Sequence, residues 1–456
     1  MSTEQPSIQT GATLTGFCPR SVANPKPHTK GAIMNTSKAS SNQFADTPAW
    51  YLRTSAFWFA TSFKWFILFI LLPLQVGTLA KTGEANQAWG QVVALGAAWA
   101  MIGPALFGWL SDRSSSKFGK RRPFIAIGSA MTVISLAFLG AANSLPLMMI
   151  GYLFLQVSDD VATGPYASVL PDLVPMEHRG KASGIIGLLQ LSAQIVAAVV
   201  GFLLSGNLLA VYGAIAGVNL ICGLIVVLAL KERPRTDTVS AVTGPFFSLN
   251  DWIAPWRSAD FRYVWFSRAL VALGFYIITN YAVNYMKDVI KVFAIPGLVT
   301  LKDPMQAAIA VVLLMSISGA AISVTAGRWV DTIGRRKVTV WSGWAMFITL
   351  IPFALVPRFD VILIVGTLFG AAYGVYMASS VALVADVLPD AESSAKDMGI
   401  WQASVSSPQI VSGLCGVLVD VVNRQRAGLG YAAAFLISAG AFLLGCQLVR
   451  RIKGSR

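Results

Sequence analysis

The residues best placed to do chemistry are three charged side chains inside long apolar stretches, namely Lys64, Asp159 and Asp160. In a membrane, a carboxylate at mid-depth costs about 3 kcal/mol unless it faces water, meets a partner or takes up a proton. Adjacent carboxylates also repel each other in a medium of low dielectric constant, so one of the two aspartates is expected to hold a proton. This is the chemistry that a proton carrier requires.

Each of these residues also has a structural interpretation. One aspartate could cap a break in its helix near Gly164-Pro165 while the other pairs permanently with a cation. Lys64 could extend its long side chain to the lipid headgroups, which its aromatic neighbours would favour. Arg268 lies only about two turns inside its apolar stretch, and we interpret it as an interface anchor or inner gate.

The elements that must position these residues are long and apolar. Hydrophobic residues make up 55% of the chain and charged residues only 12%, which is typical of a polytopic membrane protein. Twelve stretches are each long enough to cross a bilayer as a helix. They cover about 56–78, 88–110, 124–142, 145–170, 182–204, 208–230, 263–286, 306–326, 338–356, 361–384, 400–421 and 429–448. The sequence therefore predicts an all-α polytopic membrane protein with twelve transmembrane helices.

The net charge of +14 comes from Lys and Arg in short loops and at the chain ends. By the positive-inside rule these loops face the cytoplasm, and an even number of spans places both termini there. We expect a multi-pass protein of the plasma membrane or bacterial inner membrane, with the lipid bilayer as partner and no nucleic acid. The four cysteines and two histidines lack metal-ligand spacing, and no GxxxxGKS/T phosphate loop occurs. We therefore expect no metal, no cofactor and no enzyme activity.

A basic segment recurs in the two halves of the chain. Residues 108–122 read GWLSDRSSSKFGKRR, and residues 327–337 read GRWVDTIGRRK, with the same Gly-Asp-Gly frame. The sequence DLVP at 172–175 recurs as DVLP at 386–389 with similar spacing. We infer two related units, each a bundle of six helices, arranged with pseudo-symmetry.

This repeat sets the expected organisation of the chain. The first segment is rich in Ser, Thr, Gln, Pro and Asn without apolar periodicity, which is typical of disorder. The expected parts are a disordered cytoplasmic tail at 1–49, an N-terminal six-helix bundle at 50–230, a cytoplasmic linker at 231–262, a C-terminal six-helix bundle at 263–449 and a basic cytoplasmic tail at 450–456.

The basic segment resembles the loop 2–3 signature of the major facilitator superfamily, and its second copy resembles the repeat of that signature. Residues 111–125 and the pattern around Gly164-Pro165 resemble more narrowly the sucrose transporters and the glycoside-pentoside-hexuronide group of cation symporters. The resemblance implies secondary active transport of a small molecule, a sugar or glycoside, coupled to a proton or another monovalent cation. The chain departs from it at Gln156, where sucrose transporters have the aspartate of the fourth span.

The resemblance also implies roles for charged residues. In the superfamily the first and fourth spans line the cavity, so Lys64 is expected to form a switchable ion pair with Asp159 or Asp160. The loop aspartates and arginines bridge the halves when the outside is open, which makes the cytoplasmic gate. The expected gate residues are Gly108, Asp112, Arg113, Gly119, Arg121, Arg122, Gly327, Asp331, Arg335 and Arg336. A purely topogenic role is the alternative, but it does not explain why glycine and aspartate recur with the positive charges.

Polar and aromatic residues at helical spacing on the central helices are the candidates for binding the cargo. Amides supply donors and acceptors, which hydroxyl-rich ligands require, and aromatic rings can stack on a pyranose face. The candidates are Gln156, Gln190, Gln194, Tyr276, Asn280, Asn284, Tyr373, Trp401, Gln402 and Gln409. Any one of them could instead bond one helix to another. Because Tyr373 matches Asp159 at the repeat spacing, we expect the first half to handle the proton and the second more of the cargo.

These features together favour proton-coupled symport of a sugar or glycoside by alternating access. A proton-driven exporter of amphipathic small molecules is the alternative within transport, because aromatic residues are frequent and fixed charges few. Outside transport, the alternatives are a non-transporting membrane sensor and a membrane-embedded enzyme. An enzyme would require a convergent nucleophile, base or metal constellation, and the sequence offers none.

Overall fold

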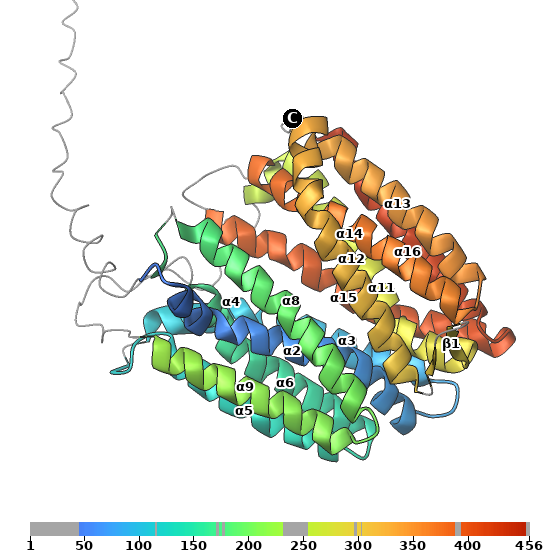
Figure 1. Ribbon diagram of the computed structural model, residues 1–456, viewed down its shortest axis with the longest axis horizontal. Coiled ribbons are helices and arrows are strands. Elements are labelled where there is room, and N and C mark those ends of the chain that lie inside the picture. Colours follow the sequence, from blue (N-terminus) through green and yellow to red (C-terminus); the bar gives the residue numbers. More distant parts are fainter. Residues whose placement is uncertain are drawn as a thin grey trace, which may run out of the picture. The chain divides into compact units, whose positions relative to one another are not determined.

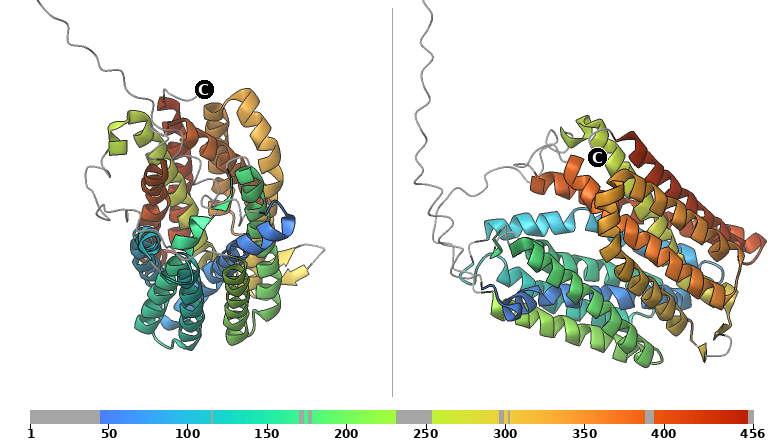
Figure 2. Two further views of the ribbon diagram at one scale, coloured as in Figure 1. Left: turned by 90° about the vertical axis from the view of Figure 1, so that its left-hand side faces the viewer. Right: turned by 45° about the horizontal axis from the view of Figure 1, so that its top comes forward.

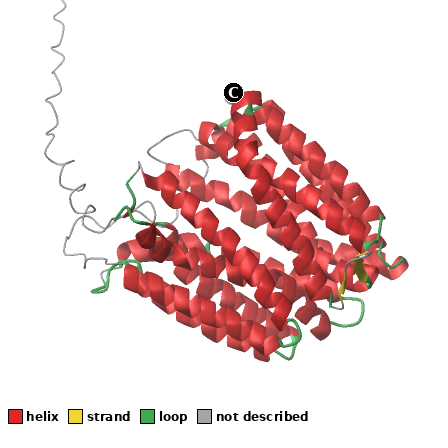
Figure 3. Cartoon of the chain, viewed as in Figure 1, coloured by secondary structure: helices red, strands yellow, loops and turns green. Residues whose placement is uncertain are grey.

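The computed structural model describes residues 45–114, 116–169, 173–175, 178–230, 254–295, 299–301, 303–387 and 394–452. Helices dominate this part of the chain, and its strands form one small two-stranded ribbon (Figure 3). Twelve helical segments are long and apolar enough to cross a membrane. The predicted all-α architecture with twelve membrane-spanning segments is confirmed.

The helices follow the predicted spans in order. Those of the first half are α2 (Pro48–Leu79), α3 (Ala85–Ala100), α4 (Gly103–Arg113), α5 (Arg122–Ala141), α6 (Leu145–Ala167), α8 (Arg179–Leu204) and α9 (Leu208–Ala229). Those of the second half are α11 (Ala259–Tyr285), α12 (Pro304–Ile333), α13 (Arg335–Leu355), α14 (Phe359–Val387), α15 (Ser394–Gln425) and α16 (Leu429–Leu448). Short turns η2 (Ala254–Arg257), η3 (Met286–Ile290) and η4 (Val449–Arg451) flank α11 and α16, and the ribbon strands are β1 (Phe293–Ile295) and β2 (Val299–Leu301).

Helix α2 begins earlier than the predicted start at residue 56. Thr47 Oγ1 accepts a hydrogen bond from the Trp50 amide at 3.3 Å, and Pro48 occupies the first turn. A capping threonine followed by proline is a strong signal for a helix start, because both satisfy or remove unpaired amides. Residues 48–49, expected in the tail, therefore belong to α2. Lys64 consequently lies near the middle of this helix.

The two halves pack by the same pattern of neighbours. In the first half α2 packs on α8 and α9, α5 on α6 and α9, and α3 and α4 on α6. In the second half α11 packs on α15 and α16, α13 on α14 and α16, and α12 on α14. Figures 1 and 2 show the two groups, blue to green and yellow to red. The predicted pseudo-symmetric bundles are confirmed.

The basic segments are helical at first and then turn. Gly108 lies in α4 and Gly327 in α12, so the predicted second loop at 327–337 is mostly helix and bends only at Gly334. Gly119 has φ 99° and Gly334 has φ 101°. Only glycine adopts this backbone region readily, which gives the recurring glycine a conformational reason. We call the end of the bundle with these turns the basic end, and the other the opposite end.

Two further segments differ from the prediction. Strands β1 and β2 pair antiparallel between α11 and α12 at the opposite end, where we predicted no strand (Figure 1). Most of the predicted linker, residues 231–253, lies outside the described part of the chain. Helix α11 begins at Ala259, inside the range expected for that linker.

The halves meet where α3 crosses α15 and where α8 packs on α12. At the first crossing a Cβ atom on Gly90 would collide with the carbonyl of Gly413, reaching 2.8 Å from its carbon. A Cβ atom on Gly413 would likewise lie 3.3 Å from Ala94 Cβ. Glycine permits this close approach of two helix backbones. The crossing lies toward the opposite end of the bundle.

Candidate functional site

The buried charges of the first half form an ion pair between α2 and α6. Lys64 Nζ donates to Asp159 Oδ1, and Trp65 Nε1 donates to Asp159 Oδ2 at 2.8 Å. Lys64 is 0% exposed and Asp159 is 4% exposed. Lys64 therefore does not extend to the lipid headgroups. Removal of either partner would leave the other as an uncompensated buried charge.

Asp160 lies in a different environment, although it is the next residue. It is 3% exposed, and its Oδ2 atom has no hydrogen-bond partner among the described residues. The side-chain donors of Trp99 and Gln156 lie beside it. Because Lys64 bonds directly to Asp159, Asp160 is the carboxylate of the pair that holds no direct bond to a cation.

The second half carries an aromatic stack in the equivalent place. Tyr373 on α14 corresponds to Asp159 on α6, and it stacks on Phe275 of α11 with ring centres 4.7 Å apart. Phe369 and Tyr376 extend this stack along α14, at 6.2 and 6.1 Å from Tyr373. Equivalent positions of the two halves thus offer different chemistry, an ion pair in one and a flat aromatic surface in the other.

Tyrosines connect these two surfaces. Tyr152 on α6 meets the Trp65 ring edge-on at 6.4 Å and lies near Tyr276 of α11. Tyr276 in turn lies near Tyr373. The two halves therefore face each other through hydroxyl-bearing rings between the ion pair and the aromatic stack. Such rings can contact both an apolar face and polar groups of a ligand.

Arg268 lies on the second-half side of this region. Its guanidinium donates to Ser380 Oγ at 3.0 Å and interacts electrostatically with Tyr276 and Tyr373. By helical rise it lies roughly 14 Å from the start of α11. These contacts connect α11 to α14 within one half. The two interpretations of Arg268, an interface anchor and an inner gate, stay predictions.

The predicted cargo-binding amides separate into groups. Asn280 donates to Ser412 Oγ at 3.0 Å, and Asn284 donates to Asn86 Oδ1 at 2.8 Å. These two bond helix to helix, which is the alternative interpretation that the sequence left open. Gln156 is buried beside Asp160. The remaining glutamines, Gln190, Gln194 and Gln409, are half-buried, and the side chains of Trp401 and Gln402 lie outside the described part.

Sequence reasoning missed a polar network at the opposite end. Asn86 Nδ2 donates to Asp420 Oδ1 at 2.8 Å and to the Tyr431 hydroxyl at 2.9 Å. The Gln87 amide donates to Asp420 Oδ2 at 2.7 Å, and Asn284 completes the shell of Asn86. Asn86 is 2% exposed and Asp420 is 4% exposed. The network joins α3 of the first half to α11, α15 and α16 of the second.

A second layer of contacts surrounds this network. Arg424 donates to Glu84 Oε1 at 3.3 Å, and the Tyr431 hydroxyl donates to Asp288 Oδ2. Asp420 was the available signal in the sequence, because it lies within the predicted span 400–421. An acid inside a span is functional by default.

The expected gate residues of the first basic segment pair with each other. Arg121 donates to Asp112 Oδ1 at 2.9 Å, and Lys120 Nζ lies 3.9 Å from the same atom. The Arg113 guanidinium lies 3.8 Å from the centre of the Trp109 ring. These contacts lie within the first half, so the bridge to the second half stays a prediction. The other gate residues lie in helices or in the turn. Gly108 lies in α4, Gly119 in the turn, Arg122 at the start of α5, and Arg335 and Arg336 at the start of α13. Gly327 and Asp331 lie in α12, where the surroundings of these two residues are outside the described structure.

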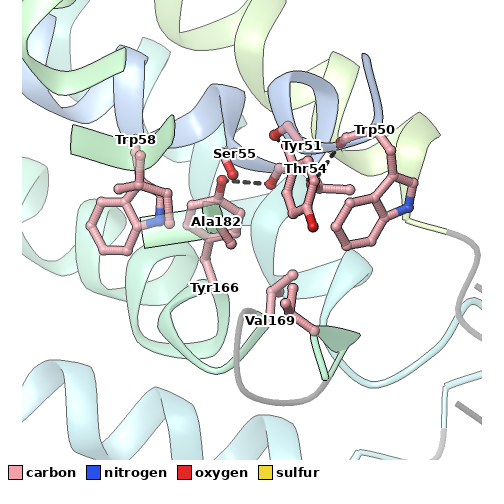
Figure 4. A pocket seen from close by; sticks show the side chains of 10 residues that line it. Trp50, Tyr51, Thr54, Ser55, Trp58, Tyr166, Val169 and Ala182 are labelled. Atoms are coloured by element: carbon pink, nitrogen blue, oxygen red, sulfur yellow. Dashed lines mark hydrogen bonds between the residues drawn. The ribbon is translucent and has the colours of Figure 1, made fainter. Parts of the chain in front are cut away.

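A small pocket lies elsewhere, at the basic end of α2 (Figure 4). Its lining residues are Trp50, Tyr51, Thr54, Ser55, Trp58, Tyr166, Val169, Val174, Ala182 and Ile186. None of them is charged, and the lining includes no part of the ion pair, so we do not assign the pocket to the site. Within the described ranges, no three His, Cys, Asp or Glu side chains gather to hold a metal ion.

Part of the chain is similar to two sucrose transport proteins of Arabidopsis thaliana. SUC4 is 28% identical over 145 residues, and SUC3 is 25% identical over 166 residues. Each match covers 28% of this chain and 28% of the relative, so the chain matches less than a third of their length.

Solved structures resemble nearly the whole chain. A bacterial homologue of the human lysosomal transporter Spinster, in an inward-facing unoccupied conformation, has a TM-score of 0.67 at 15% identity and covers 90% of this chain and 99% of its own. A D-xylose-proton symporter has a TM-score of 0.64 at 16% identity and covers 89% of this chain and 98% of its own. At these identities the likeness shows the fold alone. The family model of the Major Facilitator Superfamily matches residues 19–190, 54–323 and 264–453, and the chain therefore belongs to that superfamily.

Proposed function

We propose that this transporter moves a sugar or glycoside together with a proton by alternating access. The observation that carries the proposal is the site at Lys64, Asp159 and Asp160. One carboxylate is neutralised by an ammonium group, and the next one along the helix is buried without a direct cationic partner. A buried acid in this situation gains or loses a proton at a defined step more readily than a fixed ion pair does.

The wall of the site that the second half forms supports a sugar or glycoside as the cargo. Tyr276 and Tyr373 present hydroxyl-bearing rings, and the stack of Tyr373 on Phe275 offers a flat apolar face. Sugars have apolar faces with hydroxyl groups around them, which such a wall matches. The similarity to sucrose transport proteins over part of the chain agrees with this assignment.

We further propose that the basic end faces the cytoplasm, as the positive-inside rule requires. The Asn86–Asp420 network and the Gly90–Gly413 crossing then close the outer side. In the alternating-access scheme, these contacts must separate when the outside opens, while contacts of the basic segments form.

Uptake into liposomes tests the function. The purified protein should take up one or more members of a panel of sugars and glycosides, and an inward-directed proton gradient should increase this uptake. Amphipathic cations and drugs serve as the comparison panel. If the protein transports only the comparison panel, and a proton gradient drives the export of these compounds, it is an exporter of amphipathic small molecules and not a sugar symporter.

Disruption of the outer network should favour the outward-open state. In Asn86→Ala, Asp420 and Tyr431 lose their shared amide donor, at a cost of about 1–3 kcal/mol. A nearly balanced equilibrium would shift by roughly five- to 150-fold. A single cysteine replacing Ala94, which contacts Gly413 at the crossing, should then react faster with an impermeant thiol reagent added outside.

The control for this experiment is Asn143→Ala, in the exposed connection between α5 and α6. It removes an asparagine from the same end of the bundle without touching the network. Equal labelling rates in Asn86→Ala and the control would contradict the closing role of the network.

Removal of the Asp112 carboxylate, one of the expected gate residues, should act on the cytoplasmic side. Asp112 is 49% exposed, so the loss of the bridge to the second half that we expect it to form in the outward-open state should cost about 1 kcal/mol and shift the equilibrium roughly five-fold toward the inward-open state. In Asp112→Asn, a single cysteine replacing Ser406 on α15 should react faster with a reagent applied from the cytoplasmic side. Asp112→Glu should restore the parental rate. Lost transport with unchanged labelling would leave Asp112 as a folding or insertion element.

A further inference from the structure

The second membrane segment is interrupted beside the candidate site. Helix α3 ends at Ala100 and α4 begins at Gly103, with a turn at Met101 and Ile102. Pro104 has no amide hydrogen and clashes with the preceding helical turn, which explains why the helix does not continue. Ile102 occupies the cap position of α4 and has no side-chain hydrogen bond to offer. Ile102 therefore supplies no side-chain acceptor to the first amides of α4.

Asp160 occupies the notch that this interruption creates. A Cβ atom on Gly103 would collide with Asp160 Oδ2 and lie 3.0 Å from Asp160 Cγ and 2.6 Å from Trp99 Nε1. Both Asp160 Oδ2 and Trp99 Nε1 are buried without a hydrogen-bond partner in the described structure. The carboxylate thus takes the space that a side chain at position 103 would fill. Only glycine leaves room for it.

Burial and the neighbouring Asp159 disfavour an ionised Asp160, whereas the start of α4 and Trp99 favour it. The start of a helix carries a partial positive charge, and its first amides are donors. Trp99 Nε1 is also a donor and cannot accept a hydrogen bond. A protonated Asp160 would lose the attraction to the start of α4 and would need an acceptor for its new hydrogen. The position of α4 beside α6 therefore depends on the charge of Asp160.

We propose that Asp160 is a proton-controlled cap of α4, which acts through its charge beside Gly103 and not through a hydrogen bond. Uptake of a proton converts its carboxylate to a neutral carboxyl group and frees α4 to pivot at Met101 and Ile102. This inference rests on the proposed function, because it assigns the coupling proton to Asp160 and names the element that senses it. Asp159 remains bonded to Lys64 through this change.

The geometry of α4 connects this cap to the basic end. The helix carries Asp112 in its last turn, where Arg121 binds it. Its start lies against α6 as well, since a Cβ atom on Gly164 would come within 3.1 Å of Pro104 Cα. A pivot at Met101 and Ile102 would therefore move the first basic segment relative to α6. The proton site and the expected gate then share one rigid element of two to three turns.

Other titratable groups act on Asp160 from the neighbouring elements. Asp159 and Tyr152 lie on its own helix, and Lys64 faces it from α2. Helix α5 presents the hydroxyl groups of Thr132 and Ser135 to Ser158, two residues before Asp160 on α6. The charged groups of α4, Asp112 and Arg113, lie at its far end, roughly 13 Å from Gly103. A response to pH must therefore be assigned by substitution of Asp160 itself.

The experiment measures the position of α4 without any transported substrate. Spin labels are attached to cysteines replacing Leu110 on α4 and Ile127 on α5, which are 37% and 54% exposed, in the full chain lacking its native cysteines. The distance between the labels should change from alkaline to acidic buffer. Asp160→Asn should give the acidic distance in both buffers, because the amide is neutral. Gly103→Ala should also lose the response, because its methyl group displaces the carboxylate.

Gly187→Ala is the matched control, because a Cβ atom there meets nothing within 4 Å. It should keep the full response to pH. A distance that does not change with pH, or a change that persists in Asp160→Asn, would overturn the inference even if sugar uptake were normal. A response abolished by Asp160→Asn in a protein that transports no sugar would keep the cap and refute the proposed function.

Discussion

Lys64→Ala should destabilise the folded protein more than any other single change considered for this chain. It leaves Asp159 buried with one tryptophan donor and no cation, and breaking a buried ion pair from one side costs about 3–5 kcal/mol. The loss should appear as a large fall in melting temperature in detergent, followed by the fluorescence of the 13 tryptophans.

Double variants test whether Lys64 interacts directly with Asp159. Lys64→Ala combined with Asp159→Asn removes both charges and should recover most of the lost stability. Lys64→Ala combined with Asp160→Asn should not recover it, because Lys64 Nζ bonds Asp159. If the melting temperatures of both double variants equal those expected from adding the effects of the single variants, Lys64 does not interact with either acid.

Asp160→Asn should abolish accumulation against a gradient while exchange of cargo across the membrane continues. With one proton per sugar, a gradient of one pH unit supports about tenfold accumulation, since one pK unit is about 1.4 kcal/mol. The variant should reach only equal concentrations inside and outside. The amide has nearly the same shape as the carboxyl group, so the fold and the ion pair at Asp159 should persist.

Counterflow of labelled sugar is the control for this variant. It requires cargo binding and the conformational exchange but no proton gradient. Full accumulation by Asp160→Asn would exclude this residue as the coupling site. Loss of counterflow together with accumulation would instead indicate a defect in folding or cargo binding.

The membrane spans could be predicted from sequence because length and apolar composition alone decide whether a helix crosses a bilayer. The depth of Lys64 and Asp159 on their helices could be predicted for the same reason. The resemblance to the superfamily led us to expect an ion pair of Lys64 with Asp159 or Asp160, but which aspartate Lys64 contacts required the packing of α2 against its neighbours. That packing depends on contacts distant in sequence, which no local pattern encodes.

The interruption at Met101 and Ile102 illustrates a second limit. Both residues are apolar, so the span from 88 to 110 looks continuous in composition, and only Pro104 signals a break. The notch for Asp160 follows from this break. It could not be located without the position of α6 beside it.

Asn280 and Asn284 illustrate a third limit. Their spacing of one helical turn places them on the same face of α11, and the structure bears out that shared face. Sequence does not identify what that face meets. It meets α15 and Asn86 of α3, so one predicted set of cavity amides belongs instead to contacts between helices.

Simultaneous measurement of proton and sugar movement tests whether Asp160 couples the two. Liposomes containing the purified protein and a pH-sensitive dye are given sugar outside, with no initial pH gradient and with the membrane potential clamped. We expect sugar entry to acidify the interior in the parent protein and not in Asp160→Asn, although both exchange sugar. Sugar entry without acidification in the parent protein, or equal acidification in both, would contradict proton coupling through Asp160.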